Sequence, residues 1–178
     1  MTRLVILDRD GVINQNSEHY IRSAAEWHAL PGALDAIAKL THAGYTLVIA
    51  TNQAGVGKGT FSEAALEDIH RKLLREVADA GGHIDHVFAC LHRQDELCGC
   101  RKPQPGMLIE ACKRYGVAPR DAPFVGDSAR DIKAALAAGC RPILVLTGDG
   151  QLTRTNPDLP VDLPVYSDLL AFAMDQCK

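Results

Sequence analysis

The segment Leu4-Val5-Ile6-Leu7-Asp8-Arg9-Asp10-Gly11 joins a short apolar run to a charged cluster and a glycine. The apolar run predicts a buried β-strand, and the polar residues after it predict a turn. If the extended geometry continues past the strand, Asp8 and Asp10 face the same side, because alternate residues of a strand share a face. Gly11 then allows the chain to turn sharply away. The segment therefore predicts two carboxylates in one pocket at the end of the first strand.

Strand and helix patterns alternate along the rest of the chain. Apolar runs that lead into polar residues predict further strands at 45–50, 86–90, 123–126 and 142–146. One-sided apolar stripes predict helices at about 31–44, 62–77, 106–115, 129–138 and 168–176. This alternation is typical of an α/β fold with a doubly wound, mostly parallel sheet and helices on both faces. We expect a single domain over residues 1–178, without a separate cap domain, because the intervals between motifs hold only helices and short loops.

The composition indicates an ordinary globular protein and excludes several classes of function. Hydrophobic residues make up 47% of the chain and charged residues 23%, with a net charge of −3. The 19 Lys and Arg residues are scattered, which argues against a nucleic-acid binder. The N-terminal apolar run is too short for a signal peptide core, and no stretch could span a membrane. We expect a soluble cytoplasmic monomer, whose six cysteines are thiols or metal ligands rather than disulfides.

Polar residues at the ends of several predicted strands point to phosphate chemistry. Asp8, Thr51 and Asp127 follow three strands, and Lys102 precedes a helix. The carboxyl ends of parallel strands meet at one edge of a sheet, where ligands bind. Three carboxylates in one pocket repel each other unless a hard cation lies between them, and oxygen ligands suit Mg²⁺. The Thr51 hydroxyl and the Lys102 ammonium match the charge of a transferring phosphoryl group.

Each of these residues alone has an ordinary structural explanation. An Asp at the end of a strand is usually a helix cap or a solvated turn residue, and Asp127 could simply cap the helix after it. The order of the motifs makes that explanation weak. Four motifs follow one another, each after a strand or before a helix: Asp8-Arg9-Asp10-Gly11, Thr51-Asn52, Lys102-Pro103 and Gly126-Asp127-Ser128-Ala129-Arg130-Asp131.

These four motifs resemble those of the haloacid dehalogenase (HAD)-like phosphatases, and the resemblance covers nearly the whole chain. It implies a Rossmann-like fold in which Asp8 is the nucleophile and Asp10 the general acid and base. It also implies that Asp8, the backbone carbonyl of Asp10 and Asp127 hold Mg²⁺, while Thr51 and Lys102 stabilise the phosphoryl group. Asp131 could bind the ion directly or through water, and we favour the indirect contact.

A cluster of soft ligands precedes Arg101. Cys90, His92, Cys98 and Cys100 form two close pairs, and four such ligands bind Zn²⁺ tetrahedrally with no open position. We therefore predict a structural zinc site that shapes a short loop; the alternative is a set of unrelated reduced thiols. The remaining histidines, His70 among them, lack a partner pattern and are expected to be surface or packing residues.

Within this superfamily the zinc loop ahead of Arg-Lys-Pro is similar to that of the heptose bisphosphate phosphatases and their relatives, the histidinol-phosphate phosphatases. The stretches 8–14 with Tyr20, and 51–61, resemble the former more closely. The likeness implies removal of the 7-phosphate of D-glycero-D-manno-heptose 1,7-bisphosphate on the route to nucleotide-activated heptose and lipopolysaccharide. Arg101 would bind the distal phosphate. The predicted substrate contacts are Asn16, Ser17, His19, Tyr20, Thr51, Asn52, Gln53, Arg101 and Lys102.

Two positions depart from these relatives, and two other classes of protein stay open. Ser128 stands where a basic residue is common, so Arg130 could replace that contact, and Lys58 stands where Arg is common. A signalling receiver domain also uses Asp, Thr and Lys on a doubly wound sheet, but its phosphorylated Asp lies in the interior of the chain. A zinc-stabilised binding module without catalysis would have no reason to keep all four motifs.

Overall fold

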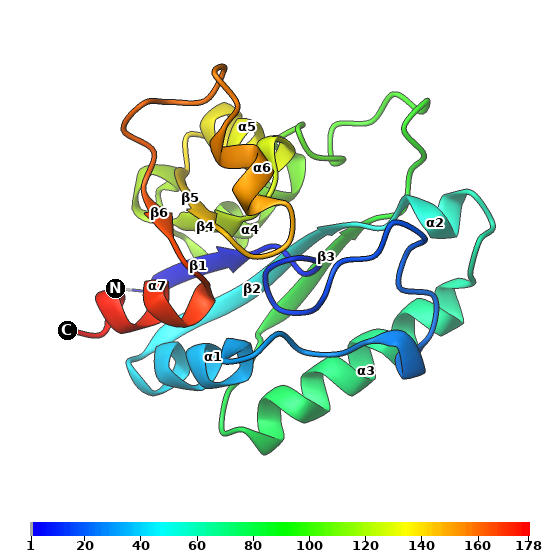
Figure 1. The fold of residues 1–178 in the computed structure, drawn as a ribbon, viewed down its shortest axis with the longest axis horizontal. Helices are drawn as coiled ribbons and strands as arrows, with labels where there is room; N and C mark the ends of the chain where they lie inside the picture. The colour runs from blue at the N-terminus through cyan, green and yellow to red at the C-terminus, as the bar shows by residue number, and fades with distance from the viewer. Residues whose placement is uncertain (1) are drawn as a thin grey trace.

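The computed structural model describes residues 2–178, and its centre is one six-stranded sheet with every strand parallel (Figure 1). The spatial order is β3-β2-β1-β4-β5-β6, which confirms the predicted doubly wound α/β fold. The strands are β1 (Arg3–Leu7), β2 (Tyr45–Asn52), β3 (His86–Cys90), β4 (Pro123–Gly126), β5 (Arg141–Val145) and β6 (Val165–Tyr166). β6 was not predicted, because two residues are too few to form a periodic pattern.

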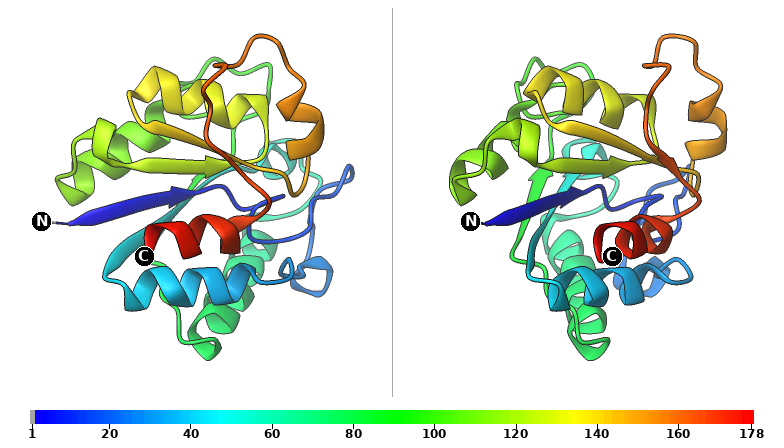
Figure 2. Two further views of the ribbon diagram at one scale, coloured as in Figure 1. Left: turned by 60° about the vertical axis from the view of Figure 1, so that its left-hand side comes forward. Right: turned by 90° about the vertical axis from the view of Figure 1, so that its left-hand side faces the viewer.

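Helices cover both faces of the sheet and create two hydrophobic cores (Figure 2). Val5 and Leu7 of β1 belong to one core, and Leu4 and Ile6 belong to the other, because successive side chains of a strand point to opposite faces. The first core is covered by α1 (Ala33–His42), α3 (Glu63–Asp79) and α7 (Leu169–Gln176). The second is covered by α4 (Gly106–Tyr115) and α5 (Ala129–Ala138).

Local sequence signals fix the ends of the longer helices. The Ser62 side chain accepts a hydrogen bond from the backbone N–H of Ala65 and so caps α3. Ser128 and Asp131 form a reciprocal capping box at the start of α5. The short elements that complete the chain are η1 (Ala24–Glu26), α2 (Ala54–Gly57), η2 (Pro119–Asp121) and α6 (Gly150–Arg154). None of the helices described over residues 2–178 combines the length and apolarity that crossing a membrane requires.

The register of the central strands brings their carboxyl ends to one edge. Leu7 of β1 lies beside Ile49 of β2 and Val125 of β4. The backbone N–H of Asp8 continues this ladder with a 2.9 Å hydrogen bond to the carbonyl of Val125. The residues that follow β1, β2 and β4 therefore emerge side by side, as expected for ligand-binding groups in an open parallel sheet.

Candidate active site

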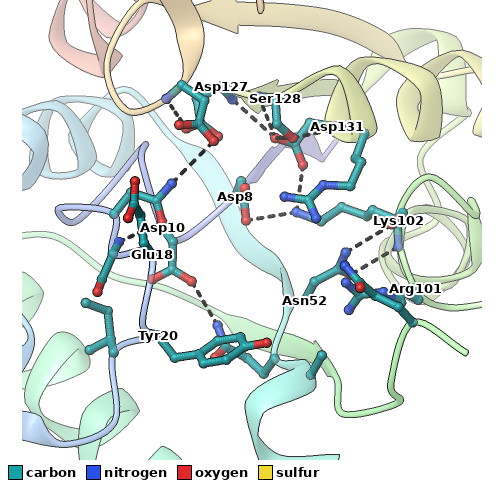
Figure 3. Close-up of a pocket in the computed structure, with 18 residues that line it drawn as sticks. Asp8, Asp10, Glu18, Tyr20, Asn52, Arg101, Lys102, Asp127, Ser128 and Asp131 are labelled. Atoms are coloured by element: carbon teal, nitrogen blue, oxygen red, sulfur yellow. Dashed lines mark hydrogen bonds and ion pairs between the residues drawn. The ribbon is translucent and has the colours of Figure 1, made fainter. Parts of the chain in front are cut away.

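A cavity of about 330 Å³ opens at this edge (Figure 3). Of the predicted site residues, the cavity wall includes Asp8, Asp10, Asn16, Ser17, Tyr20, Asn52, Gln53, Arg101, Lys102 and Asp127. The same wall contains Arg130, which was predicted as a possible replacement contact, and residues that were not predicted as substrate contacts: Glu18, Ile21, Ala54, Gln94, Ser128, Asp131 and Asp149. Segments that are distant in sequence thus converge on one polar cavity.

The carboxylates of Asp8, Asp127 and Asp131 form a compact buried cluster, with an oxygen of each within 4.8 Å of the others. Burial, reinforced by the charge of Asp131, raises the pKa of Asp8 well above its usual value. The same two causes raise the pKa of Asp127 to about 7. These carboxylates repel one another when they are ionised, and a divalent cation bound between them would remove that repulsion. The spacing of Asp8 and Asp127 allows both to bind one ion, and their oxygen chemistry fits Mg²⁺.

The ammonium group of Lys102 contacts two carboxylates of this cluster. Its ammonium nitrogen lies 2.8 Å from an oxygen of Asp8, 2.8 Å from an oxygen of Asp131 and 2.9 Å from the carbonyl oxygen of Ala50. Burial alone would lower the pKa of Lys102, but the charges of Asp131 and Asp8 outweigh it and raise the pKa. The side chain is therefore a fixed positive charge beside the predicted nucleophile.

Both oxygens of Asp131 already have partners. Oδ1 pairs with Lys102, and Oδ2 accepts hydrogen bonds from the backbone N–H groups of Asp127 and Ser128 at 3.2 and 3.0 Å and from the Ser128 hydroxyl at 2.8 Å. Burial opposes ionisation of Asp131, but the charge of Lys102 and these hydrogen bonds leave its pKa below the usual value. Asp131 thus connects Lys102 to the backbone that carries Asp127, which agrees with an indirect role at the metal.

Two glycines and one backbone amide hold Asp127. A Cβ atom added to Gly11 would lie 2.0 Å from Asp127 Oδ2, and one added to Gly148 would lie 2.1 Å from it. The backbone N–H of Asp149 donates a 2.8 Å hydrogen bond to the same oxygen. Only residues without a side chain leave room for the carboxylate, so Gly11 is needed for close approach as well as for its positive φ of 83°.

Asp10 has its own set of partners, separate from the carboxylate cluster. Arg9 Nε and Nη2 donate to Oδ1 at 3.1 and 2.9 Å, and Asn14 Nδ2 donates to the same oxygen at 2.9 Å. Gln53 Nε2 donates to Oδ2 at 3.0 Å. Burial raises the pKa of Asp10, but the Arg9 charge and the hydrogen bonds from Asn14, Arg9 and Gln53 more than offset it, so the pKa is lowered. Sequence reasoning did not find Arg9 and Asn14, which lie between or just after motif residues and carry no pattern of their own.

Two predicted substrate residues lie outside the cavity wall. Thr51 is fully buried, and its hydroxyl oxygen accepts a 2.9 Å hydrogen bond from Gln53 Nε2. His19 lines a neighbouring pocket together with Tyr20. Tyr20, which lines both pockets, has a φ of 67°, and its hydroxyl receives a 2.9 Å hydrogen bond from Lys58 Nζ. Lys58 therefore contacts the loop that carries Tyr20.

The four predicted zinc ligands come together in the loop after β3. Cys90 Sγ lies 3.4 Å from His92 Nδ1 and 3.1 Å from Cys100 Sγ, and Cys98 Sγ lies 3.9 Å from Cys90 Sγ. Ligands about 2.0–2.3 Å from a tetrahedral zinc ion lie roughly 3.3–3.8 Å from one another. The observed separations of 3.1, 3.4 and 3.9 Å are close to this range, so the cluster is compact enough to hold such an ion. The backbone N–H of Arg101 donates to Cys98 Sγ at 3.4 Å, which ties the cluster to the cavity wall.

Arg101, which lines the cavity, has one unpaired donor atom. Its Nη1 atom is buried and has no hydrogen-bond partner in residues 2–178. Buried guanidinium donors are normally paired, because an unpaired one loses its hydration without compensation. Arg101 and Arg130 both line the cavity wall, so an anionic group that enters the cavity would meet positive charge there.

Comparisons with known proteins place the chain in a family. A model described as HAD-hydrolase-like matches residues 99–171. D-glycero-β-D-manno-heptose-1,7-bisphosphate 7-phosphatase from Bordetella bronchiseptica is 50% identical over 96% of both chains, and the enzyme of that name from Pseudomonas putida is 45% identical over 97% of this chain and 98% of its own.

Solved structures agree with this assignment. A crystal structure of D,D-heptose 1,7-bisphosphate phosphatase from B. bronchiseptica, complexed with magnesium and phosphate, has a TM-score of 0.96 and 48% identity over 98% of both chains. A second one from Burkholderia thailandensis has a TM-score of 0.78 and 46% identity, with the same coverage. These findings confirm the predicted resemblance: the chain belongs to the D-glycero-β-D-manno-heptose-1,7-bisphosphate 7-phosphatase family of HAD-like hydrolases.

Proposed function

We propose that this protein is a magnesium-dependent phosphatase that removes the 7-phosphate of D-glycero-D-manno-heptose 1,7-bisphosphate through a phospho-aspartate on Asp8. The observation that carries this proposal is the position of Asp8, between the Lys102 ammonium at 2.8 Å and the carboxylate of Asp127, which is close enough to share an ion. The names of the relatives at 45–50% identity over almost the full chain support the substrate.

The proposed reaction uses the two carboxylates of the first motif in turn. An oxygen of Asp8 attacks phosphorus, and the bond from phosphorus to the sugar oxygen breaks. Asp10 gives its proton to that oxygen, and then takes a proton from the water that hydrolyses the aspartyl-phosphate. Lys102 stabilises negative charge on the phosphoryl oxygens. Bound Mg²⁺, held by Asp8, Asp127 and the carbonyl of Asp10, would supply further neutralisation of that charge.

The remote end of the substrate would contact the loops around the cavity. A bisphosphate carries a second dianion, and the unpaired Nη1 donor of Arg101 supports this side chain as its ligand. Asn16, Ser17 and Tyr20 also line the cavity and would contact the sugar hydroxyls. The zinc ion held by Cys90, His92, Cys98 and Cys100 would keep the Arg101 segment in place.

The cellular setting belongs to the same proposal. We infer an enzyme of the cytoplasm that acts as a monomer on a small phosphorylated sugar, in the synthesis of nucleotide-activated heptose for lipopolysaccharide. The scattered basic residues and the net charge of −3 support a small-molecule substrate rather than a nucleic acid.

A substrate panel tests this function. Phosphate release is measured with Mg²⁺ for the α- and β-anomers of heptose 1,7-bisphosphate, histidinol phosphate and fructose 1,6-bisphosphate, and the heptose product is analysed for the position of its remaining phosphate. We expect the heptose bisphosphate to have the highest kcat/KM and to keep its 1-phosphate. If kcat/KM for histidinol phosphate is higher by orders of magnitude, the proposed substrate is wrong but the proposed mechanism still holds. Undiminished activity in Asp8→Asn would exclude Asp8 as the nucleophile.

A further inference from the structure

Arg9 lies between the two catalytic aspartates in the sequence, yet its side chain is completely buried and bonded to Asp10 alone of the two. The guanidinium uses Nε and Nη2 for Asp10. Nη1 points elsewhere and lies 3.2 Å from Nε2 of His70, a residue of α3. Since Arg9 is always a donor, Nε2 of His70 must be the acceptor, and the ring must be neutral.

The surroundings of His70 keep it neutral. Burial and the neighbouring Arg9 charge lower the pKa of His70 to about 4, against a smaller opposite effect from Asp10. At neutral pH the imidazole can therefore accept the Arg9 hydrogen bond throughout the reaction. Without this acceptor, the third donor group of a fully buried guanidinium would lose its hydrogen-bond partner, which would favour a shift of the Arg9 side chain.

The arrangement distinguishes the two oxygens of Asp10. Oδ1 accepts from three donors: Nε and Nη2 of Arg9, and Nδ2 of Asn14. Oδ2 accepts one hydrogen bond at 3.0 Å from Gln53 and a longer one at 3.2 Å from Arg9. The oxygen with fewer and longer hydrogen bonds is the one that can carry a transferable proton. Nε and Nη2 of Arg9 thus fix the plane of the carboxylate. Oδ2 is the less strongly bonded oxygen and is the one available to the substrate.

We propose that His70 is a positioning residue for proton transfer: through Arg9 it fixes the Asp10 carboxylate so that Oδ2 faces the leaving oxygen. This inference rests on the proposed function, because it assigns the geometry of the acid in that reaction. In the step concerned, the Asp8–phosphorus bond forms, the bond from phosphorus to the sugar oxygen breaks, and the Oδ2 proton moves to the sugar oxygen. His70 itself exchanges no proton.

The test compares leaving groups that differ in their need for a proton. An alkoxide from a sugar phosphate must be protonated as it leaves, whereas p-nitrophenolate departs without a proton. For both substrates kcat/KM reports steps up to formation of the aspartyl-phosphate, before Asp10 acts as a base. We compare His70→Leu, which removes the acceptor, with His70→Gln, whose amide oxygen can accept from Arg9. Arg75→Leu, at an exposed position of the same helix, controls for disturbance of α3.

In His70→Leu we expect kcat/KM for heptose 1,7-bisphosphate to fall at least tenfold, while kcat/KM for p-nitrophenyl phosphate stays within about threefold of wild type. His70→Gln should recover most of the loss, and Arg75→Leu should match wild type on both substrates. An equal fall on both substrates, or no fall on the bisphosphate, would overturn the inference. If wild type rejects the heptose bisphosphate but accepts another alkyl phosphate of the panel, the proposed substrate fails, and the same comparison with that ester still decides the role of His70.

Discussion

Asn52 holds the backbone of Lys102 with both ends of its side-chain amide. Its Oδ1 accepts a 3.0 Å hydrogen bond from the Lys102 N–H, and its Nδ2 donates a 3.0 Å hydrogen bond to the Lys102 carbonyl. Asn52 ends β2, whereas Lys102 lies in the loop that leads to α4. This reciprocal pair connects the sheet to the backbone of Lys102, and the hydrogen bond from Lys102 Nζ to the carbonyl of Ala50 connects the sheet to its side chain.

Replacing Asn52 with Leu should therefore affect catalysis more than folding. Loss of two hydrogen bonds to a partly buried backbone costs about 1–3 kcal/mol, and a Lys102 that moves off Asp8 stabilises the phosphoryl group less well. We expect kcat/KM to fall by roughly 10–100-fold. Equal kcat/KM values for wild type and Asn52→Leu would show that the connection is not needed.

Gly11→Ala should damage metal binding for a reason separate from backbone strain. Gly11 and Gly44 have nearly the same φ, 83° and 81°, but an added Cβ meets Asp127 at the first position and nothing within 4 Å at the second. Both variants suffer the left-handed strain of about 1–2 kcal/mol. Only Gly11→Ala should also lose magnesium affinity, with a fall in kcat/KM of about 100-fold or more. Magnesium titration of activity in both variants, together with urea unfolding, separates the two effects. Similar magnesium dependence in both would contradict this explanation.

The carboxylate cluster should make the magnesium-free protein less stable as pH rises. Asp127, with a pKa raised to about 7 in the fold, binds a proton that the unfolded chain has released above its pKa of about 4. The stability linked to that proton is complete below about pH 4 and is lost as pH rises through about 7. His70, with a lowered pKa, acts in the opposite direction over part of this range. The wild type must therefore be compared with Asp127→Asn.

We expect the free energy of unfolding of wild type to fall between pH 5 and pH 8 by about 2 kcal/mol more than that of Asp127→Asn. Urea unfolding in magnesium-free buffer measures this difference. Addition of Mg²⁺ should remove the extra fall in wild type and have little effect on the variant, because the ion neutralises the ionised cluster. Identical pH profiles for the two proteins would mean that Asp127 titrates normally in the fold.

Removal of one zinc ligand should disorder the loop that carries Arg101. Cys98→Ser leaves three ligands, and the bond from the Arg101 N–H to the Cys98 sulfur is lost as well. We expect the zinc content, measured by plasma mass spectrometry, to fall well below one ion per chain, and trypsin to cleave faster at Arg93. Cys177→Ser, an exposed cysteine outside the cluster, is the matched control. Full zinc content in Cys98→Ser would contradict the four-ligand site.

The fold was predictable because its signals are local. Each central strand is an apolar run followed by polar residues, and caps such as Ser62 and Ser128 mark where helices begin. The order of strands across the sheet then places Asp8 and Asp127 at one edge, since both follow neighbouring parallel strands. The cluster of Cys90, His92, Cys98 and Cys100 was also predictable, because all four lie within eleven consecutive residues.

The remainder of the site depends on contacts between distant segments. His70 has no neighbour in sequence that hints at Arg9, and its position depends on how α3 packs on the sheet. The support of Asp127 by Gly148 and Asp149 comes from the turn after β5, where glycine and aspartate are ordinary turn residues. The contact of Thr51 with substrate stays a prediction from its motif; in the structure its buried hydroxyl oxygen accepts a hydrogen bond from Gln53.

The two hydrophobic cores described above lie on the two sides from which the two proposed catalytic carboxylates are supported. Asp8 is supported from the α4 and α5 side, by Lys102 and by Asp131, whereas Asp10 is supported through Arg9 and His70 from the α3 side. Substitutions that repack the α3 side of the sheet could therefore change proton transfer by Asp10 without moving the nucleophile Asp8. In relatives that hydrolyse an ester whose leaving group depends more strongly on protonation, we expect the adaptive substitutions to lie mainly on α3.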